Sequence, residues 1–239
     1  MDSISQLQNM INECNNIVFF GGAGVSTESN IPDFRSADGL YQQKYHYSPE
    51  EIVSHSFFMH KTNDFYDFYK EKMMFLDAMP NPAHFKLAEL ENTGKLKAVI
   101  TQNIDGLHQA AGSKNVLELH GSILRNYCMR CEKFYDAAYV KNASGIPTCT
   151  CGGIVKPDVV LYEESLDSDV INRSIEAIAS ADMLIIGGTS LVVYPAAGFI
   201  DYFRGKYLVV INKSETSKRV RADLVIREPI GEVMKQIEV

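Results

Sequence analysis

Short runs of apolar, largely β-branched residues recur along the chain, with longer polar or amphipathic stretches between them. Four runs are prominent and a fifth is weaker, and they lie at residues 17–20, 98–101, 183–186, 207–211 and 224–226. Runs that are apolar at consecutive positions indicate strands buried on both faces, as in a parallel sheet covered by helices. The pattern therefore predicts an α/β fold.

The stretches between these runs favour helices. Asn81 followed by Pro82 is a typical helix start, because asparagine caps free backbone N–H groups and proline suits the first helical position. This pair predicts a helix that continues through Leu90. Residues 170–180 and 230–237 have the amphipathic spacing of helices that pack on a sheet.

Two segments interrupt the alternation of runs and helices. Residues 41–79 are rich in aromatic side chains and are expected to be helical, whereas residues 122–155 contain four cysteines. We interpret both segments as insertions that together form a smaller domain over the sheet. The remaining residues, 1–40, 80–121 and 156–239, are then expected to form a Rossmann-like domain.

The cysteines of the second insertion come in two close pairs. Cys128 is close in sequence to Cys131, and Cys149 to Cys151, and seventeen residues separate the two pairs. This spacing lies close to that of a structural zinc site, in which two turns each present two thiolates to one ion. Four thiolates leave no open coordination position, so the ion would be structural and would not activate water. Disulfides or four unrelated thiols are the alternatives, and Cys14 has no assigned role.

The composition restricts the class of protein. Of 239 residues, 46% are hydrophobic and 22% are charged, which is ordinary for a globular protein with a sizeable core. The net charge of −7 argues against general affinity for nucleic acid or an anionic membrane, and would suit a basic peptide better. The first residues do not resemble a secretory signal, and no window approaches the roughly 18 apolar residues of a membrane span. With thiols held as zinc ligands, these features indicate a cytoplasmic protein.

Three of the apolar runs lead directly into loops that contain glycine or polar residues, at 21–24, 102–106 and 187–190. In open α/β sheets, ligands bind where such loops meet, at the carboxyl ends of the strands. Glycines in the first loop would let the backbone approach a pyrophosphate closely. The loop is not a strict G-x-G-x-x-G, because Thr27 stands where the third glycine would be, and a plain tight turn accounts for it about as well.

Several longer segments together resemble the signature motifs of the sirtuins, the NAD-dependent protein lysine deacylases. The matches occur in the family's order and cover essentially the whole chain. They are residues 22–36 (GAGVSTESNIPDFRS), 101–108 (TQNIDGLH), 119–122 (LHGS), the two cysteine pairs, 188–191 (GTSL) and 211–212 (IN). The resemblance implies a Rossmann-like NAD-binding domain, a smaller zinc-containing domain and the activity of a bacterial-type deacetylase.

The resemblance also implies roles for individual residues. His120 matches the general base, and an imidazole, which titrates near neutral pH, can remove a proton from a ribose hydroxyl. Asn103 would orient the ribose or a water molecule, and Gln102 would bond to the ribose. Asp105 would accept hydrogen bonds from the nicotinamide carboxamide, with Ile104 packed beside it. The other expected NAD contacts are Ala23, Thr27, Phe34, Arg35, Thr189, Ser190, Asn212 and Ile230.

The expected substrates are acetyl-lysine-containing proteins or peptides. In the family the peptide adds as a strand between two extended segments, which match residues 159–163 and 191–194 here. Val160, Tyr162 and Val193 would contact it. Because strand addition uses main-chain hydrogen bonds, little selectivity for peptide sequence is expected.

The implied reaction consumes NAD and transfers no hydride. The acyl-lysine carbonyl oxygen attacks C1′ of the nicotinamide ribose, nicotinamide leaves, and His120 deprotonates a ribose hydroxyl. Water then releases free lysine and O-acetyl-ADP-ribose.

Two departures from common family patterns bear on the acyl group. Tyr162-Glu163-Glu164 stands where many sirtuins have Phe-Gly-Glu, so we expect a bulkier and more acidic entrance. Residues 69–72 (YKEK) stand where a subgroup acting on acidic acyl groups has Tyr-x-x-Arg, and lysine lacks the planar fork that clamps a carboxylate. This favours acetyl and similar neutral acyl groups, and leaves a residual desuccinylase activity open.

Other functions are compatible with parts of the sequence. A mono-ADP-ribosyltransferase or an NAD glycohydrolase would use the same site and would differ in its products. An NAD-dependent dehydrogenase is disfavoured by the incomplete glycine fingerprint and the zinc motif. A module that only senses NAD or ADP-ribose would need no base at His120. Outside their motifs, Asn103 and Asp105 would be ordinary turn residues.

Overall fold

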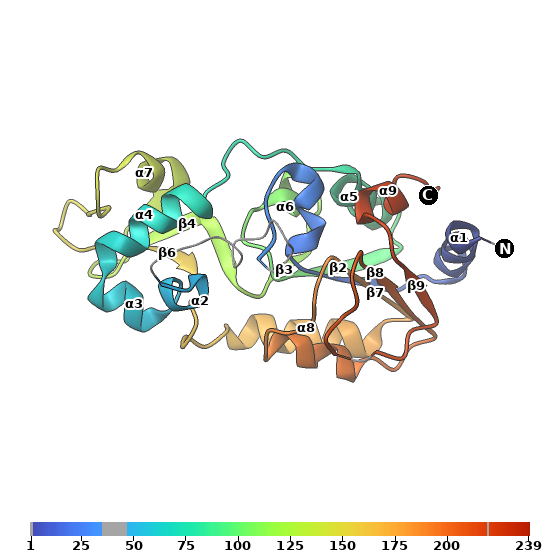
Figure 1. Cartoon of the computed structure of the whole chain (residues 1–239). Helices are drawn as coiled ribbons and strands as arrows, with labels where there is room; N and C mark the ends of the chain where they lie inside the picture. Colours follow the sequence, from blue (N-terminus) through green and yellow to red (C-terminus); the bar gives the residue numbers. More distant parts are fainter. Residues whose placement is uncertain (1, 35–46, 219) are drawn as a thin grey trace.

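The computed structural model describes residues 2–34, 47–218 and 220–239, which form two lobes (Figure 1). The larger lobe is built on a six-stranded parallel sheet with the order β3-β2-β1-β7-β8-β9. Both ends of the chain lie at the side of this lobe that faces away from the smaller one (Figure 1). Its strands are β1 (Ile17–Gly21), β2 (Leu96–Thr101), β3 (Val116–Glu118), β7 (Met183–Gly187), β8 (Tyr207–Ile211) and β9 (Leu224–Ile226).

β1 lies between the two halves of this sheet. β2 and β3 extend the sheet on one side of it, and β7, β8 and β9 extend it on the other. Leaving out the strands of the smaller lobe, this is the strand order of dinucleotide-binding Rossmann folds, with a ligand-binding crevice where the order reverses. β1 and β7 are paired from Ile17 with Met183 to Gly21 with Gly187. The loops that follow these two strands therefore begin at the same level.

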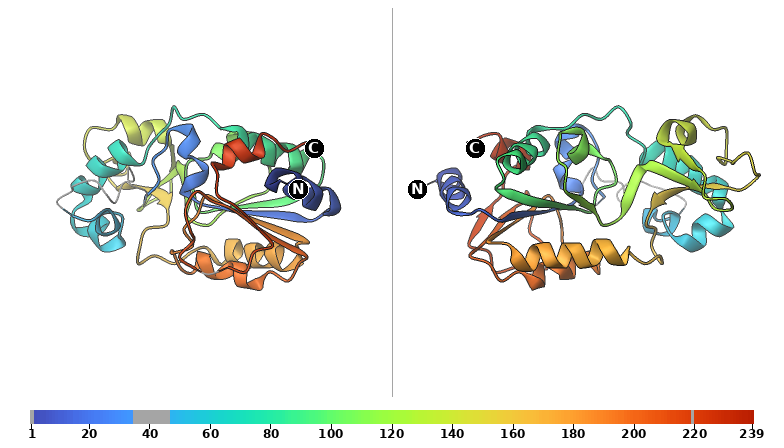
Figure 2. Two further views of the ribbon diagram at one scale, coloured as in Figure 1. Left: turned by 45° about the vertical axis from the view of Figure 1, so that its right-hand side comes forward. Right: turned by 180° about the vertical axis from the view of Figure 1, so that it is seen from behind.

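Helices cover both faces of the sheet (Figure 2). Their bounds are α1 (Ser3–Glu13), α5 (Pro82–Asn92) and α9 (Ile230–Met234) on one face, and α8 (Ser168–Ser180) and the 3-10 helix η4 (Ala196–Tyr202) on the other. Phe19 and Ile185 belong to the apolar cluster on the first face, and Phe20 and Ile186 to the cluster on the second. Successive residues of a strand point to opposite faces, which is why consecutive apolar residues are needed here.

The smaller lobe combines the two insertions. Its sheet has the order β5-β4-β6. Its elements are β4 (Gly121–Cys128), β5 (Phe134–Asp136), β6 (Val155–Val159), α2 (Pro49–Ile52), α3 (His55–His60), α4 (Thr62–Lys72) and α7 (Ala137–Asn142). Phe58, Phe65 and Tyr66, from α3 and α4, share one apolar cluster with Val155 and Val159 of β6. The aromatic segment and the cysteine-containing segment therefore share one core.

The predicted elements match the structure closely. The five apolar runs form β1, β2, β7, β8 and β9, so the predicted α/β fold with a parallel sheet is confirmed. The helix predicted after Asn81 is α5, and the Asn81 side chain accepts a hydrogen bond from the Ala83 amide at 3.0 Å. β3, with three residues, was not predicted. Within the described ranges, no helix has the length and apolar character needed to cross a membrane.

Candidate active site

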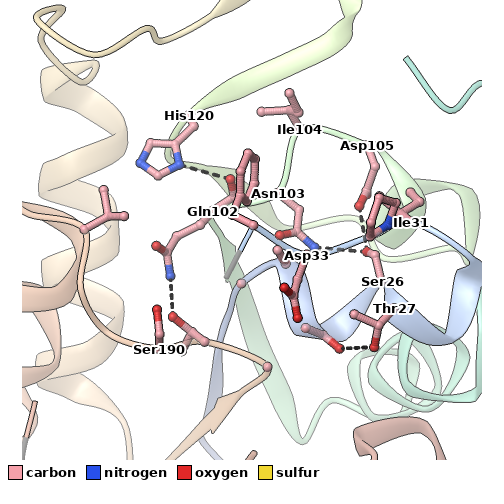
Figure 3. A pocket seen from close by; sticks show the side chains of 18 of the residues that line it. Ser26, Thr27, Ile31, Asp33, Gln102, Asn103, Ile104, Asp105, His120 and Ser190 are labelled. Carbon is pink, nitrogen blue, oxygen red and sulfur yellow. Dashed lines mark hydrogen bonds between the residues drawn. The ribbon is translucent and has the colours of Figure 1, made fainter. Parts of the chain in front are cut away.

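A cavity of about 1070 Å³ lies at the carboxyl ends of β1, β2 and β7. The loops that follow these strands form one side of it (Figure 3). The smaller lobe contributes the wall at residues 159–164 and at Val53, Met73 and Phe75. The switch point of the sheet and the junction of the two lobes thus border one cavity.

The loops after β1 and β7 touch through their backbones beside this cavity. The Gly24 amide donates to the Gly188 carbonyl oxygen at 2.8 Å. A Cβ on Gly24 would lie 2.8 Å from the Gly188 oxygen, and one on Gly188, which has φ of +57°, would lie 2.3 Å from the Val25 nitrogen. Only glycine fits such an approach. Thr27, where a third glycine was sought, donates its hydroxyl hydrogen to the Gly24 carbonyl at 3.0 Å and stabilises the same loop.

His120 lies immediately before β4, where the chain passes into the smaller lobe. Its Nδ1 atom lies 3.0 Å from the Gln102 carbonyl oxygen (Figure 3). A carbonyl oxygen only accepts hydrogen bonds, so Nδ1 carries the hydrogen and Nε2 the lone pair. Burial lowers the pKa of His120, and the bond to Gln102 opposes part of this effect. The imidazole is therefore neutral near pH 7 and able to accept a proton at Nε2.

Asn103 and Asp105 are joined through the hydroxyl of Ser26, on the loop after β1 (Figure 3). Asn103 Nδ2 donates to Ser26 Oγ at 3.0 Å, and Ser26 Oγ donates to Asp105 Oδ2 at 2.6 Å. The other oxygen of Asp105 accepts the Leu107 amide at 2.9 Å. Burial raises the pKa of Asp105, while the bond from Ser26 lowers it. The carboxyl group is thus held in one orientation beside the cavity.

Gln102 connects the loops after β2 and β7. Its Nε2 atom donates to Thr189 Oγ1 at 3.0 Å, and Thr189 Oγ1 accepts the Leu191 amide at 3.2 Å. Thr189 is buried and Ser190 is partly buried. The Gln102 carbonyl therefore orients His120, and the Gln102 side chain binds the loop after β7, which we call the second glycine loop.

The far end of the cavity is formed by β8, the loop after it and the start of α9. Asn212 Nδ2 donates to the Ser214 carbonyl at 2.8 Å, and Ile230 is buried at the first position of α9. Glu28 Oε2 accepts the Gly231 amide at 2.6 Å. This bond joins α9 to the 3-10 helix η2 (Thr27–Ser29) in the loop after β1.

The described residues with a predicted role in NAD or substrate binding all line this cavity. Arg35 lies outside the described residues. Those that line the cavity are Ala23, Thr27, Phe34, Gln102, Asn103, Ile104, Asp105, His120, Val160, Tyr162, Thr189, Ser190, Val193, Asn212 and Ile230.

The two segments expected to hold a peptide differ from each other. Residues 159–162 are extended, and the Val160 amide donates to the His120 carbonyl at 3.0 Å. Residues 191–194 are not a regular strand, because Leu191 has φ of +54° and a bend and a turn follow it. Val193 and Tyr194 still line the cavity, as Tyr162 does. The expectation of a second extended segment is therefore wrong for residues 191–194.

The residues linked with acyl-group selectivity are separated in the structure. Tyr69 is fully buried in the core of the smaller lobe, whereas Lys72 borders the cavity. The Lys72 ammonium pairs with Glu71 Oε1 at 2.8 Å. Of the two, only the lysine contributes to the lining of the cavity.

The four paired cysteines converge away from the cavity, at the end of β4. Their Sγ atoms all lie within 4.8 Å of one another, and the nearest distances are 3.5 Å from Cys128 to Cys151 and 3.6 Å from Cys131 to Cys149. Four thiolates at about 2.3 Å from a tetrahedral zinc ion need similar separations. The Arg130 amide points to Cys128 Sγ at 3.4 Å, which would stabilise a thiolate. All five cysteines are free thiols, so the disulfide alternative is wrong. The arrangement fits a zinc ion.

Two supporting residues were not predicted. Ser26 connects Asn103 with Asp105, and Asn81 Nδ2 donates to the Val25 carbonyl at 2.8 Å, which fixes the loop after β1 to the start of α5. Ser26 lies inside the first motif, so its position was known. Its bonding to a loop about 80 residues away depends on the sheet, which the motif does not describe.

Comparisons with known proteins agree with this geometry. A family model described as the Sir2 family matches residues 22–195. The NAD-dependent protein deacetylase of Clostridium perfringens is 61% identical over 240 residues, with 99% of this chain and 98% of that protein covered. The corresponding protein of Staphylococcus aureus is 42% identical over 236 residues, with 98% and 97% covered.

Solved structures give the same result. A Sir2 protein described with a deacetylated p53 peptide and 3′-O-acetyl ADP ribose has a TM-score of 0.91 and 38% identity, with 98% of this chain and 97% of that chain covered. A structure described as Sir2 with p53 peptide and NAD+ has a TM-score of 0.87 and 39% identity, with 99% and 97% covered. The fold is thus that of an NAD-binding α/β protein with an inserted smaller lobe. The chain belongs to the Sir2 family, as its motifs predicted.

Proposed function

We propose that this protein is an NAD-dependent protein lysine deacetylase, and that the cavity between the lobes is its active site. The observation that carries the proposal is the state of His120: a neutral, oriented imidazole on the wall that NAD and an acyl-lysine would share. The relatives named as deacetylases match nearly the full length of the chain. NAD would supply an electrophilic C1′ carbon and nicotinamide as its leaving group.

The residues of the large lobe would bind and orient NAD. The close approach of Gly24 and Gly188 leaves room for a pyrophosphate beside the backbone. Asp105, fixed by Ser26, would accept hydrogen bonds from a carboxamide, and Asn103 would orient a ribose or a water molecule. Ala23, Thr27, Phe34, Ile104, Thr189, Ser190, Asn212 and Ile230 would complete the contacts, and Arg35 is assigned by its motif alone.

His120 would act as the general base. Nε2 would take a proton from a ribose hydroxyl, because Nδ1 is already occupied by its hydrogen bond to Gln102. The Gln102 carbonyl stabilises the positive charge that the ring then carries. Gln102 also fixes the position of Thr189, so the base and the second glycine loop are aligned by one residue.

The substrate would enter between Val160 and Tyr162 on one side and Val193 on the other. These side chains would enclose the apolar stem of an acetylated lysine, and a peptide strand would lie along the extended segment. Acetyl-lysine-containing proteins or peptides are the proposed substrates. An acetyl group is favoured because Lys72 borders the cavity at the position where an arginine would clamp an acidic acyl group, and Tyr69 is buried away from it.

The proposed organisation has two domains and one structural metal ion. Residues 1–40, 80–121 and 156–239 would form the NAD-binding domain, and residues 41–79 and 122–155 the smaller one. The separate apolar clusters support this division with one correction: Val159 and Leu161 pack in the cluster of the smaller lobe, so its last boundary lies beyond Leu161 and not after residue 155. Cys128, Cys131, Cys149 and Cys151 would hold one zinc ion. We place the protein in the cytoplasm, where thiols stay reduced.

The decisive experiment is mass spectrometry of acetyl-, succinyl- and longer-acyl-lysine peptides incubated with the protein and NAD. We expect loss of the acetyl group together with equal amounts of nicotinamide and O-acetyl-ADP-ribose. Nicotinamide with free ADP-ribose and an unchanged peptide would indicate an NAD glycohydrolase instead. A gain of ADP-ribose on the protein target would indicate a transferase.

A further inference from the structure

The substrate-side wall of the cavity ends in a tight turn of unusual composition. The Glu164 amide donates to the Leu161 carbonyl at 3.0 Å, so residues 161–164 form a β-turn. Glu163 occupies its third position with φ of +75°. A residue with a side chain is strained in this conformation, which glycine adopts freely. Holding a glutamate there costs about 1–2 kcal/mol relative to ordinary backbone.

The Glu163 side chain makes two contacts with the helical insertion. Its Oε2 atom accepts hydrogen bonds from the Ser56 amide at 2.8 Å and from Ser56 Oγ at 2.6 Å. These bonds lower the pKa of Glu163, so the carboxylate is charged at neutral pH. Ser56 is in the first turn of α3, which belongs to the helical insertion.

The same turn has other links to α3. The His55 amide donates to the Tyr162 carbonyl at 2.9 Å, and the Tyr162 amide donates to the Val53 carbonyl at 3.0 Å. Glu164 contacts His55 Nδ1 at 2.9 Å and accepts the Leu161 amide at 2.9 Å. Both carboxylates thus reach α3, Glu164 at His55 and Glu163 at Ser56, and Glu164 also closes the turn through the Leu161 amide.

We propose that Glu163 is a positioning residue that clamps the peptide-binding segment 159–162 onto α3. The inference rests on the proposed function, since it assigns segment 159–162 to the substrate. The strained backbone and the side-chain contacts support each other: the left-handed conformation aims the carboxylate at Ser56, and the two bonds to Ser56 hold the turn. Val160, which precedes the turn, and Tyr162, its second residue, are thereby kept in place on the wall of the cavity.

The clamp should affect peptide binding and not the chemical step. Glu163 makes its hydrogen bonds to Ser56, and the NAD side of the cavity is built from other loops. Because the peptide would bind by adding to an extended segment, an ordered segment costs less entropy on binding. Loss of the clamp should therefore raise KM for the peptide, while kcat and KM for NAD change little.

Three substitutions at Glu163 distinguish the effect of its side-chain hydrogen bonds from the effect of its backbone strain. Glu163→Ala removes the acceptor and keeps a side chain at positive φ. Glu163→Gly removes the acceptor and relieves the strain. Glu163→Gln keeps an oxygen that can accept from Ser56. We expect KM for an acetylated peptide to rise about fivefold in the alanine and glycine variants and to stay within about twofold in the glutamine variant.

Glu132→Gly is the matched control. Glu132 is also exposed and has φ of +58°, but it lies on the cysteine-rich loop and not on the cavity. Its substitution relieves backbone strain of the same kind and should leave KM for peptide and NAD unchanged. If Glu163→Gly, like Glu132→Gly, leaves KM for the peptide unchanged, the Glu163 side chain does not position the peptide-binding segment and the clamp is refuted.

Two further measurements need no turnover. Amide hydrogen exchange at Ser56 should be accelerated by Glu163→Ala and not by Glu163→Gln, and binding of an acetylated peptide in titrations without NAD should weaken in parallel. Unchanged exchange at Ser56 would refute the clamp, and faster exchange with unchanged peptide affinity would refute its positioning role. A wild-type protein that binds peptide and yields no nicotinamide would contradict the proposed function and still allow the clamp to be judged.

Discussion

His120 Nδ1 lies 3.0 Å from the Gln102 carbonyl oxygen, and this contact determines which nitrogen of the ring can accept a proton. Because burial lowers the pKa of His120, we expect the base to titrate below the 6.5 of a free imidazole. The neutral form is the active one, so kcat/KM should be constant above this pKa and fall about tenfold per pH unit below it. A pH profile of nicotinamide release measures this, and a kinetic pKa above 7 would contradict it.

Replacement of His120 by alanine tests its role directly. We expect turnover to fall by a factor of at least about 100, because the general base is lost. NAD and peptide binding should largely survive, since the glycine loops and segment 159–162 do not depend on the imidazole. Steady-state rates and binding titrations on the same preparation distinguish the two effects. Turnover close to that of the wild type would remove His120 from the mechanism.

Ser26 is expected to matter although it has no chemical step of its own. In Ser26→Ala, the buried Asn103 amide loses its acceptor and Asp105 loses a donor that lowers its pKa. We expect KM for NAD to rise about tenfold, because a buried polar group left unpaired costs about 1–3 kcal/mol. Ser180→Ala, at the exposed end of α8, serves as the control. Equal KM values for NAD in the two variants would contradict the bridging role.

Removal of the metal should weaken the smaller lobe more than the sheet. Four thiolates bound to zinc stabilise a lobe whose own core is small, so a chelator should lower the thermal unfolding temperature and the hydrogen-exchange protection of β4 to β6. Cys149→Ala should abolish binding of one zinc ion per chain, measured by elemental analysis. Cys14→Ala should retain it, because Cys14 packs in the core beneath the sheet. A protein without zinc that keeps its stability and activity would rule out this site.

The buried pair His84 and His108 predicts how stability depends on pH. Their ring centroids lie 4.7 Å apart, and burial lowers the pKa of His84 to about 4 and that of His108 well below its usual value. Between pH 6.5 and 4 the unfolded imidazoles therefore bind protons that the folded ones do not. As the pH is lowered through this range, the free energy of unfolding should decrease, by up to about 1.4 kcal/mol per pH unit for each ring.

Urea denaturation between pH 7.5 and 4.5 would measure this dependence. In His108→Leu the slope should be shallower by about one proton, whatever the stability of the variant at pH 7. An identical slope in the wild type and the variant would show that His108 does not contribute to the acid sensitivity. Neither ring is on the cavity wall, so the effect belongs to stability and not to the pH profile of the reaction.

The sequence alone predicted the sheet because its strands are buried on both faces. Ile17–Phe20 and Met183–Ile186 are apolar at every position, and short runs of this composition are typical of strands inside a parallel sheet. β3 was not predicted because it has only three residues, two of them partly buried, and so lacks a recognisable hydrophobic pattern. The irregular course of residues 191–194 was also missed, since the positive φ at Leu191 occurs at a residue type that rarely adopts it.

The candidate site was predicted through motifs more than through physical patterns. His120 and Asp105 were found because they lie in recognisable segments, whereas Ser26, which joins two of those segments, was not assigned a role. Hydrogen bonds such as the one from Ser26 to Asp105 depend on how the strands are ordered in the sheet. In the sequence, Glu163 was visible only as a departure from the family pattern. Its left-handed backbone conformation and its contact with Ser56 could be found only from the structure.

The contact between Gly24 and Gly188 has a consequence for mutagenesis of this protein. Alanine substitution normally removes atoms, and its effect is read as the value of what was lost. At these two positions it adds a methyl group where 2.8 Å and 2.3 Å separate the new carbon from neighbouring backbone atoms. An alanine scan that skips glycines would therefore overlook the part of the cavity whose shape depends on missing side chains.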